Sequence, residues 1–180
     1  MKKVFKVFPA WAYDKEEKWL NEMSAMGWEL QSYTAFQYHF TKSEPGKYQY
    51  GLELLPYWPG SEEEKKYLEF LEDSGIEMMD RYLLWGYFRK KNDGKPFVMF
   101  SDLDGRIAHV NRVIVLMFVV LALLLYSFTS LVQIPLFSLS AVRVVFLVLF
   151  YIPSFLFAGG GFYALFSKRK DLQMERNIRE

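Results

Sequence analysis

The sequence contains no cysteine and only two histidines among its 180 residues. The absence of cysteine excludes disulfide bonds, thiol catalysis and cysteine-ligated zinc. His39 and His109 lie far apart in the sequence, and neither has carboxylates at metal-ligand spacing, so we predict no bound metal. No glycine-rich phosphate loop precedes a helix and no nucleophile elbow occurs, so we expect neither a catalytic residue nor a cofactor.

Positive charge does not dominate the first part of the chain. Residues 1–105 hold 14 Lys or Arg and 18 Asp or Glu, whereas residues 113–142 hold no charged residue. A nucleic-acid-binding domain normally needs a basic face, so the acidic balance argues against nucleic acid as a partner. The sharp change in composition predicts a domain of residues 1–105 followed by a second region, 106–180.

The N-terminus begins with MKKVFKVFPAW. Lysines before an apolar stretch are typical of a signal peptide, but Lys6 interrupts this stretch and the acidic run Asp14 to Glu17 follows it. We therefore expect the segment to form the first strand of the fold.

Two apolar segments, residues 113–132 and 144–166, have the length of membrane-spanning helices. Residues 133–143 between them are expected to form a tight reversal, so the two spans make a hairpin. Basic residues flank the open end of this hairpin at Arg106, Arg112, Lys168, Arg169 and Lys170, and only Arg143 lies in its loop. The positive-inside rule then places both termini in the cytoplasm of a multi-pass cell-membrane protein.

The second apolar segment has two further features. Pro153 is expected to kink its helix, and Gly159, Gly160 and Gly161 permit the close approach of another helix. That helix is expected to be the first span of the same chain, with a second copy or another protein as the alternative. Neither segment has a charged residue or histidine between its ends, which argues against transport.

An internal repeat at a gapless offset of 48 residues is the most informative feature of residues 1–105. EEKWLNEMSAMGWEL (Glu16–Leu30) aligns with EKKYLEFLEDSGIEM (Glu64–Met78), and Phe40, Lys42 and Gly46 align with Phe88, Lys90 and Gly94. Such a match predicts the duplication of one supersecondary unit.

Each unit is predicted to be β-α-β-β. Each helix is expected to start at a capping box and to end at a glycine: Asp14 with Glu17 and then Gly27, and Ser61 with Glu64 and then Gly75. Residues 47–55 alternate as a half-buried antiparallel strand does. Two such units predict an α+β fold with both helices on one side of an antiparallel sheet, a ferredoxin-like sandwich.

The open face of this sheet is the predicted binding surface. His39, Trp85, Tyr87 and Arg89 are expected to point away from the helices, where they would bind a partner. Alternatively, residues 97–100 or a second protomer would cover them. Trp11 and Trp58, each near a proline, are the candidate rim of a pocket.

The motifs EEKWLNEMSAMGWEL, EPGKYQYGLELL, GIEMMDRY, WGYFRKK and FSD occur in this order. In this pattern, residues 2–112 resemble the domain-of-unknown-function family 2812 (DUF2812), which is found mainly in Firmicutes. The resemblance implies C-terminal transmembrane helices and a gene often encoded beside a PadR-type transcriptional regulator. It carries over no catalytic residue, so it bears on the architecture more than on the function.

These observations support two functions from different classes. The first is a non-enzymatic, membrane-anchored regulatory or sensory protein whose cytoplasmic domain binds a protein partner, such as a PadR-type regulator, with a homo-oligomer as a further expectation. The second is a small-ligand-binding module with an aromatic pocket in the α+β domain. An enzyme would need a deep pocket with convergent polar groups.

Overall fold

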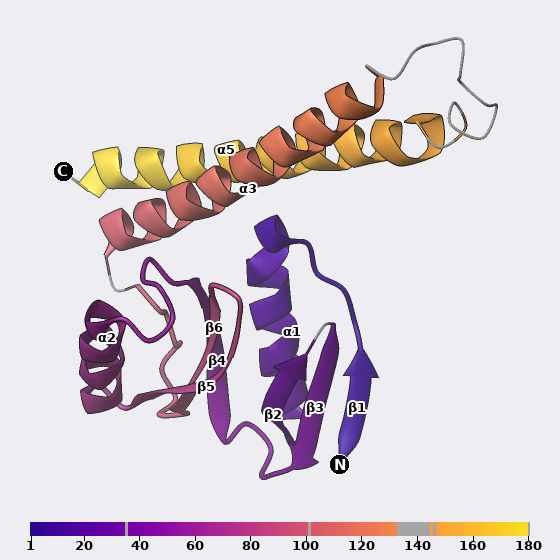
Figure 1. Ribbon diagram of the computed structural model, residues 1–180. Helices are drawn as coiled ribbons and strands as arrows, with labels where there is room; N and C mark the ends of the chain where they lie inside the picture. Colours follow the sequence, from indigo (N-terminus) through magenta and orange to yellow (C-terminus); the bar gives the residue numbers. More distant parts are fainter. Residues whose placement is uncertain (35, 101, 133–144, 146, 180) are drawn as a thin grey trace. The chain divides into compact units, whose positions relative to one another are not determined.

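The computed structural model describes residues 1–34, 36–100, 102–132, 145 and 147–179. The chain divides into two compact units, Met1–Asp102 and Leu103–Glu180, which we call unit 1 and unit 2 (Figure 1). The dividing point lies three residues before the boundary expected from composition, where the first long helix begins.

Unit 1 contains the element order β-α-β-β twice (Figure 1). The first half consists of β1 (Lys2–Phe5), a 3-10 turn (Ala10–Ala12), α1 (Tyr13–Ala25), β2 (Trp28–Thr34) and β3 (Gln37–Lys42). The second half consists of β4 (Tyr48–Leu54), α2 (Glu62–Asp73), β5 (Ile76–Tyr82) and β6 (Trp85–Lys91). The repeat seen in the sequence is therefore present as two halves with the same element order.

Each half forms its own three-stranded antiparallel sheet, in the orders β1-β3-β2 and β4-β6-β5. A β-bulge interrupts both halves at equivalent places, between Leu30 and Ser32 in β2 and between Met78 and Asp80 in β5. The expectation of one continuous sheet is therefore corrected, because the described strands belong to two sheets. The two orders are the same permutation, which supports the duplication independently of residue identity.

The two helices of unit 1 begin differently. In α2, Ser61 Oγ accepts a hydrogen bond from Glu64 N at 3.2 Å, and Glu64 Oε2 accepts one from Gly60 N at 2.5 Å, which is close to the expected capping box. The expectation for Asp14 is wrong. The N-cap of α1 is Ala12, which follows the 3-10 turn and makes no side-chain cap.

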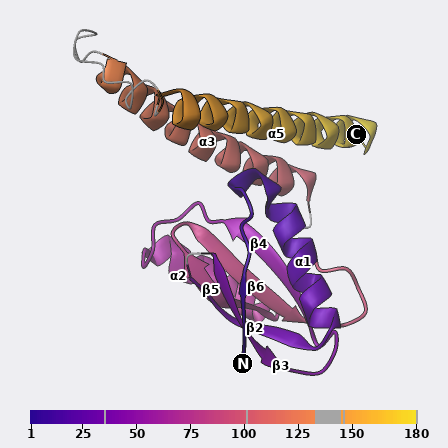
Figure 2. The same ribbon diagram turned by 90° about the vertical axis from the view of Figure 1, so that its right-hand side faces the viewer.

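The larger core of unit 1 lies between the two sheets. Its helix is α1, which belongs to the first half (Figures 1 and 2). This core combines residues of α1 with residues of both sheets: Leu20, Met23, Leu30, Tyr33, Tyr38, Phe40, Tyr50, Leu52 and Tyr87. A smaller cluster of Leu55, Leu71 and Phe88 lies beneath α2, on the other face of the second sheet. The second sheet is thus covered on both faces, by α1 on one and by α2 on the other.

A polar stripe on α1 covers the outer edge of β4. Asn21 Nδ2 donates to Tyr50 O and Asn21 Oδ1 accepts from Tyr50 N, both at 2.9 Å, as a neighbouring strand would do. Glu17 Oε2 accepts from Leu52 N at 3.2 Å, and Ser24 Oγ donates to Tyr48 O at 2.5 Å. The Glu17 carboxylate therefore accepts a hydrogen bond from the edge of β4 instead of completing a capping box.

Side chains also cover the outer edge of β2, where it meets the second sheet. Leu30 N donates to the Tyr50 hydroxyl at 2.9 Å, and Tyr33 N donates to Asp80 Oδ2 at 2.6 Å. Burial raises the pKa of Tyr50 to about 12, so its hydroxyl stays protonated. Because side-chain atoms satisfy these amides, β2 and β5 lie in contact without forming one sheet.

Unit 2 consists of two long apolar helices packed against each other (Figure 1). They are α3 (Leu103–Val132) and α5 (Ile152–Arg179), and a π-helical segment, Leu147–Tyr151, directly precedes α5. Pro153 lies in the first turn of α5, directly after the π-helical segment. The kink expected at this proline stays a prediction. The predicted reversal at residues 133–143, with Arg143, lies outside the described residues, as does Val144.

Contacts along the pair show that α3 and α5 run antiparallel. Near the N-terminus of α3, Asp104 pairs with Arg176 at 3.2 Å, and near its C-terminus Ser127 Oγ accepts from the Tyr151 hydroxyl at 3.2 Å. Between these ends, the rings of Phe118 and Phe162 lie 4.6 Å apart. By length and composition, each helix is a candidate membrane span.

The Asn21→Ala substitution tests the contact between α1 and β4. We expect it to lower the free energy of unfolding by about 2 kcal/mol, because it leaves the N–H and C=O groups of Tyr50 without their partner in a partly buried place. Hydrogen exchange of the full chain in detergent should be faster at the Tyr50 amide. Glu22→Ala, on an exposed neighbouring position of the same helix, is the control and should change neither quantity. Unchanged exchange in the Asn21 variant would contradict the strand-like role of this side chain.

Candidate functional site

The four residues predicted for the open sheet face do not share one surface. His39 and Tyr87 occupy equivalent places 48 residues apart, but their surroundings differ because α1 covers this face of the second sheet only. Tyr87 is 3% exposed and belongs to the core. His39 is half-buried, and its Nε2 has no hydrogen-bond partner among the described residues. Trp85 packs against Tyr13, with ring centroids 5.7 Å apart.

Arg89 forms a clamp between the two halves. Its guanidinium binds Glu29 at 2.6 Å and Glu77 at 2.9 Å, and it lies 4.3 Å from the centre of the Tyr48 ring. Glu29 and Glu77 are equivalent residues of the repeat, in β2 and β5. Since both the Arg89 and the Glu29 side chains are about 15% exposed, this ion pair holds β2, β5 and β6 together.

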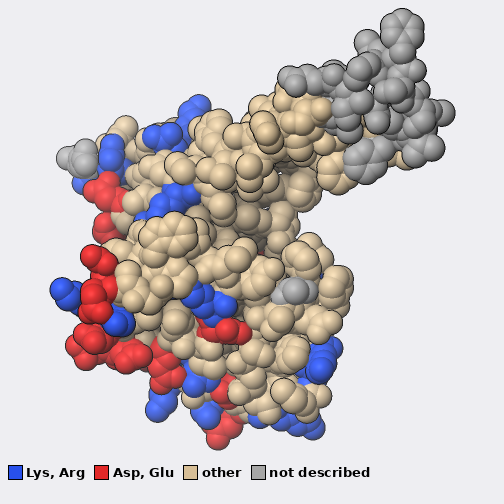
Figure 3. Space-filling model, viewed as in Figure 1, with Lys and Arg blue, Asp and Glu red and all other residues tan. Residues whose placement is uncertain are grey.

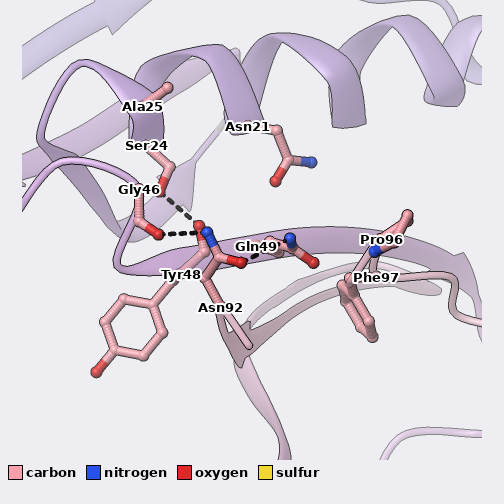
Figure 4. Close-up of a pocket in the computed structure, with 9 residues that line it drawn as sticks. All are labelled: Asn21, Ser24, Ala25, Gly46, Tyr48, Gln49, Asn92, Pro96 and Phe97. Atoms are coloured by element: carbon pink, nitrogen blue, oxygen red, sulfur yellow. Dashed lines mark hydrogen bonds between the residues drawn. The ribbon is translucent and has the colours of Figure 1, made fainter. Parts of the chain in front are cut away.

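The two tryptophans proposed as a pocket rim do not line the pocket described in unit 1. Trp58 is 78% exposed, and Trp11 is half-buried in the 3-10 turn before α1. The pocket has a volume of about 310 Å³ and lies at the other end of α1 (Figure 4). Its lining comes from α1, β4 and the segment after β6: Asn21, Ser24, Ala25, Gly46, Tyr48, Gln49, Asn92, Pro96 and Phe97.

The polar groups of this pocket are largely engaged with one another (Figure 4). Asn92 Nδ2 donates to Gly46 O at 2.8 Å, and Gln49 Nε2 donates to Asn92 Oδ1 at 3.0 Å. Ser24 and Asn21 are bound to the backbone of β4. Because these polar groups already have partners, they stabilise the contact between α1 and β4 and the turns beside it.

A buried carboxyl group surrounded by tyrosines is the strongest candidate site. Glu16, in the first turns of α1, is 8% exposed, and its Oε1 accepts hydrogen bonds from the Tyr38 and Tyr87 hydroxyls, both at 2.7 Å. The Tyr33 ring lies 4.7 Å from that of Tyr38 and 4.9 Å from that of Tyr87. We call these four residues the Glu16 cluster.

Burial controls the protonation of the Glu16 cluster. It raises the pKa of Glu16 above its ordinary value, and the hydrogen bonds from Tyr87 and Tyr38 reverse only part of that rise. Burial also raises the pKa of both tyrosines well above the ordinary value, so both hydroxyls remain donors. The cluster therefore holds one acidic group whose charge is disfavoured beside electron-rich rings.

The second half has a counterpart of this cluster with different chemistry. Glu64 is equivalent to Glu16, is 4% exposed, and forms an ion pair with Arg81, which is equivalent to Tyr33. Arg81 also donates from Nε to Leu83 O at 2.7 Å. One half thus surrounds its buried acid with hydroxyl groups, and the other neutralises it with a guanidinium group.

The three consecutive glycines of α5, Gly159 to Gly161, differ in how closely other atoms surround them. Gly161 is buried, together with Leu165 and Leu172. A Cβ atom at Gly159 or Gly160 would meet no atom within 4 Å. Within the described part of the chain, Gly161 is therefore the one glycine of the three that lies on a packed face.

Among the described residues there is no group of three or more His, Cys, Asp or Glu side chains that could hold a metal ion. The Glu16 cluster has one carboxyl group and three tyrosines, which is a set suited to hydrogen bonding or to contact with an organic cation.

The fold and the site define a class of protein: a duplicated α+β unit followed by two long apolar helices. A family model described as "Protein of unknown function (DUF2812)" matches residues 12–123. The match covers more than half of the chain, so this protein belongs to the DUF2812 family, as the sequence motifs indicated. It includes both halves of unit 1 except β1, and it extends into α3. No curated protein and no solved structure matches the chain.

Sequence reasoning placed Tyr87 among the candidate residues but missed Glu16. The signal was present, since Glu16 aligns with Glu64, whose capping position was recognised. A glutamate in the first turn of a helix is usually explained by the helix dipole, and nothing in the sequence alone indicates that tyrosines from two different sheets surround this one.

The Glu16→Gln substitution tests the protonation of the cluster. The pKa of Glu16 is raised in the folded protein, so its contribution to stability is fully present below the unfolded pKa and is lost as pH rises through the folded pKa. Glutamine keeps the acceptor for both tyrosines and carries no charge. We expect the variant to have a higher melting temperature than the wild type at pH 8 and a smaller loss of stability between pH 4 and pH 8.

Thermal unfolding across this pH range measures the effect, with Glu22→Gln, at an exposed position, as the matched control. A variant with a lower melting temperature and an unchanged pH profile would show that the charged form of Glu16 is the one the fold favours.

Proposed function

We propose that this protein is a non-enzymatic, membrane-anchored regulatory or sensory protein. Unit 1, built from two β-α-β-β halves, would bind a protein partner in the cytoplasm, and α3 and α5 would hold it at the membrane. A PadR-type transcriptional regulator is the proposed partner, on the analogy of the family resemblance.

The observation that carries the anchor is the exposed apolar surface of unit 2. In the most apolar 18-residue window of each helix, only 17% and 11% of the residues are buried. Large side chains such as Val115, Phe118, Leu123, Leu149 and Leu156 are about half exposed or more. Water would solvate this surface poorly, whereas a bilayer matches it over the length of both helices.

The charges at the ends of the hairpin support a cytoplasmic orientation. The basic residues near its open end are Arg106 and Arg112 in α3 and Lys168, Arg169 and Lys170 in α5. All of them lie within described helix, close to where the apolar stretches end. The cytoplasmic side of a bilayer is the side on which such residues accumulate, so unit 1 would share it.

A second candidate function is the binding of a small organic cation at the Glu16 cluster. The Tyr38 and Tyr87 hydroxyls both donate to Oε1 of Glu16, and Oε2 has no hydrogen-bond partner within the described part of the chain. A cation would offset the cost of ionising Glu16, and the tyrosine rings would contact it through their faces. The unequal use of the two oxygens is the observation that favours this function.

Cysteine accessibility tests the anchor and its orientation, because the protein has no native cysteine. In whole cells, an impermeant thiol reagent should label Ser138→Cys, between the two apolar segments, and should not label Lys91→Cys, at the end of β6. Both positions should react after the cells are lysed. The unsubstituted protein is the blank.

Labelling of Lys91→Cys in intact cells would place unit 1 outside and remove a cytoplasmic regulator as its partner. If the orientation holds, purification of the full chain in mild detergent should recover a DNA-binding regulator. Recovery of no specific partner under several growth conditions would contradict the regulatory function while leaving the anchor unaffected.

Tetraphenylphosphonium is a suitable probe for the second candidate function. We expect it to quench tryptophan fluorescence and to raise the melting temperature of the full chain, with a stronger effect above the pKa of Glu16 than below it. Glu16→Gln should lose the response, and Glu22→Gln should keep it. An equal response in both variants would show that the probe acts on the apolar helices or the detergent instead.

A further inference from the structure

The outer edge of β1 has no strand or helix beside it in the described part of unit 1. Among the described strands, β1 pairs with β3 alone. Lys6 N donates to Phe36 O at 3.0 Å, so alternate residues Lys2, Val4 and Lys6 bond toward β3. The backbone groups of Lys3 and Phe5 therefore point away from the sheet. An edge of this kind is open to another chain.

The equivalent strand of the second half, β4, has its outer edge covered. Glu17, Asn21 and Ser24 of α1 bind the backbone of Tyr48, Tyr50 and Leu52, as described above. They are spaced four and three residues apart, so they form one stripe along the helix. The helix of the first half thus covers the first strand of the half that follows it.

The equivalent stripe on α2 is unoccupied within the described residues. The repeat offset places Lys65, Glu69 and Glu72 at the positions of Glu17, Asn21 and Ser24, and all three are exposed. Phe70, beside this stripe, is 64% exposed. The buried side of α2 is its other face, which carries Glu64 and Leu71. The helix of the second half therefore presents a covering surface for which unit 1 provides no further strand.

The two unpaired surfaces have opposite charges. The strand carries Lys2, Lys3 and Lys6, of which the first two are exposed. The exposed face of α2 carries five acids, Glu62, Glu63, Glu69, Glu72 and Asp73, against two lysines, Lys65 and Lys66, so it is acidic on balance. Acidic side chains gather over α2 in Figure 3, and Figure 1 places β1 at the opposite side of unit 1. One chain cannot bring these two surfaces together, but two chains can.

We propose that α2 of one copy covers the β1 edge of a second copy, as α1 covers β4 within each copy. Carboxylates of the α2 stripe accept hydrogen bonds from the outward amides of β1, in the way that Glu17 accepts one from Leu52 N. The lysines of β1 pair with the remaining acids. The interface joins two different surfaces, so an open assembly of any length keeps one free β1 edge and one free α2 surface until a ring closes. This assembly is independent of the regulatory partner proposed above.

Crosslinking between two differently tagged full-length copies tests the interface. One copy carries Lys3→Cys and the other carries Glu69→Cys, and both are expressed together and oxidised in isolated membranes. We expect a disulfide-linked pair containing both tags. Glu44→Cys in place of Glu69→Cys is the matched control, because Glu44 is also acidic and exposed but lies in the loop between β3 and β4. A single chain carrying both Lys3→Cys and Glu69→Cys should form a ladder longer than a dimer or a closed ring.

Charge reversal gives the second readout. Glu72→Lys, added to the Glu69→Cys copy, should reduce crosslinking to the level of the Glu44→Cys control, whereas Glu44→Lys should leave it unchanged. Both substitutions are at exposed positions, and unchanged melting temperatures verify the fold. Crosslinking of Lys3→Cys only to itself would mean that two β1 edges pair directly, and this overturns the proposal. So does crosslinking no stronger than the control, or crosslinking that Glu72→Lys leaves intact.

Discussion

The unpaired backbone groups at the edges of short β-sheets are the constraint on which unit 1 depends. Each half has a three-stranded sheet, which leaves two edges whose backbone groups need partners. The chain satisfies these edges with side chains: the Glu17, Asn21 and Ser24 stripe for β4, and Tyr50 and Asp80 for β2. Because these bonds connect one half to the other, the two halves form a single core, and α1 is fixed between the sheets.

The same arrangement explains the chemistry of the buried acids. Placing α1 between two sheets buries its first turns, so Glu16 must receive hydrogen bonds from tyrosines of both sheets. In the second half, the equivalent Glu64 is also buried, and it forms an ion pair with Arg81. Equivalent positions of the repeat thus satisfy their buried carboxyl groups differently: tyrosine hydroxyls donate to Glu16, and a guanidinium group pairs with Glu64.

Local patterns predicted the elements better than they predicted the surfaces. The offset of 48 residues, the helix ends at Gly27 and Gly75, and the two apolar helices follow from short-range spacing, which the sequence displays directly. The burial of Tyr87 could not be predicted in this way, because it depends on α1 packing against the other half. The periodicity of a strand shows which residues share a face, but not what covers that face. For the same reason Arg89, expected on an open face, is a clamp between Glu29 and Glu77.

The dependence of one half on the helix of the other bears on how this gene arose. A single β-α-β-β ancestor would have had a helix carrying a polar stripe and a first strand lacking a cover, with no way to join the two inside one short chain. Two copies of such an ancestor could cover this strand if the helix of one packed against the strand of the other. Duplication in tandem then made that association permanent for one pair of surfaces. In the present chain, α1 and β4 make within one molecule a contact that a single unit could make only with a second copy.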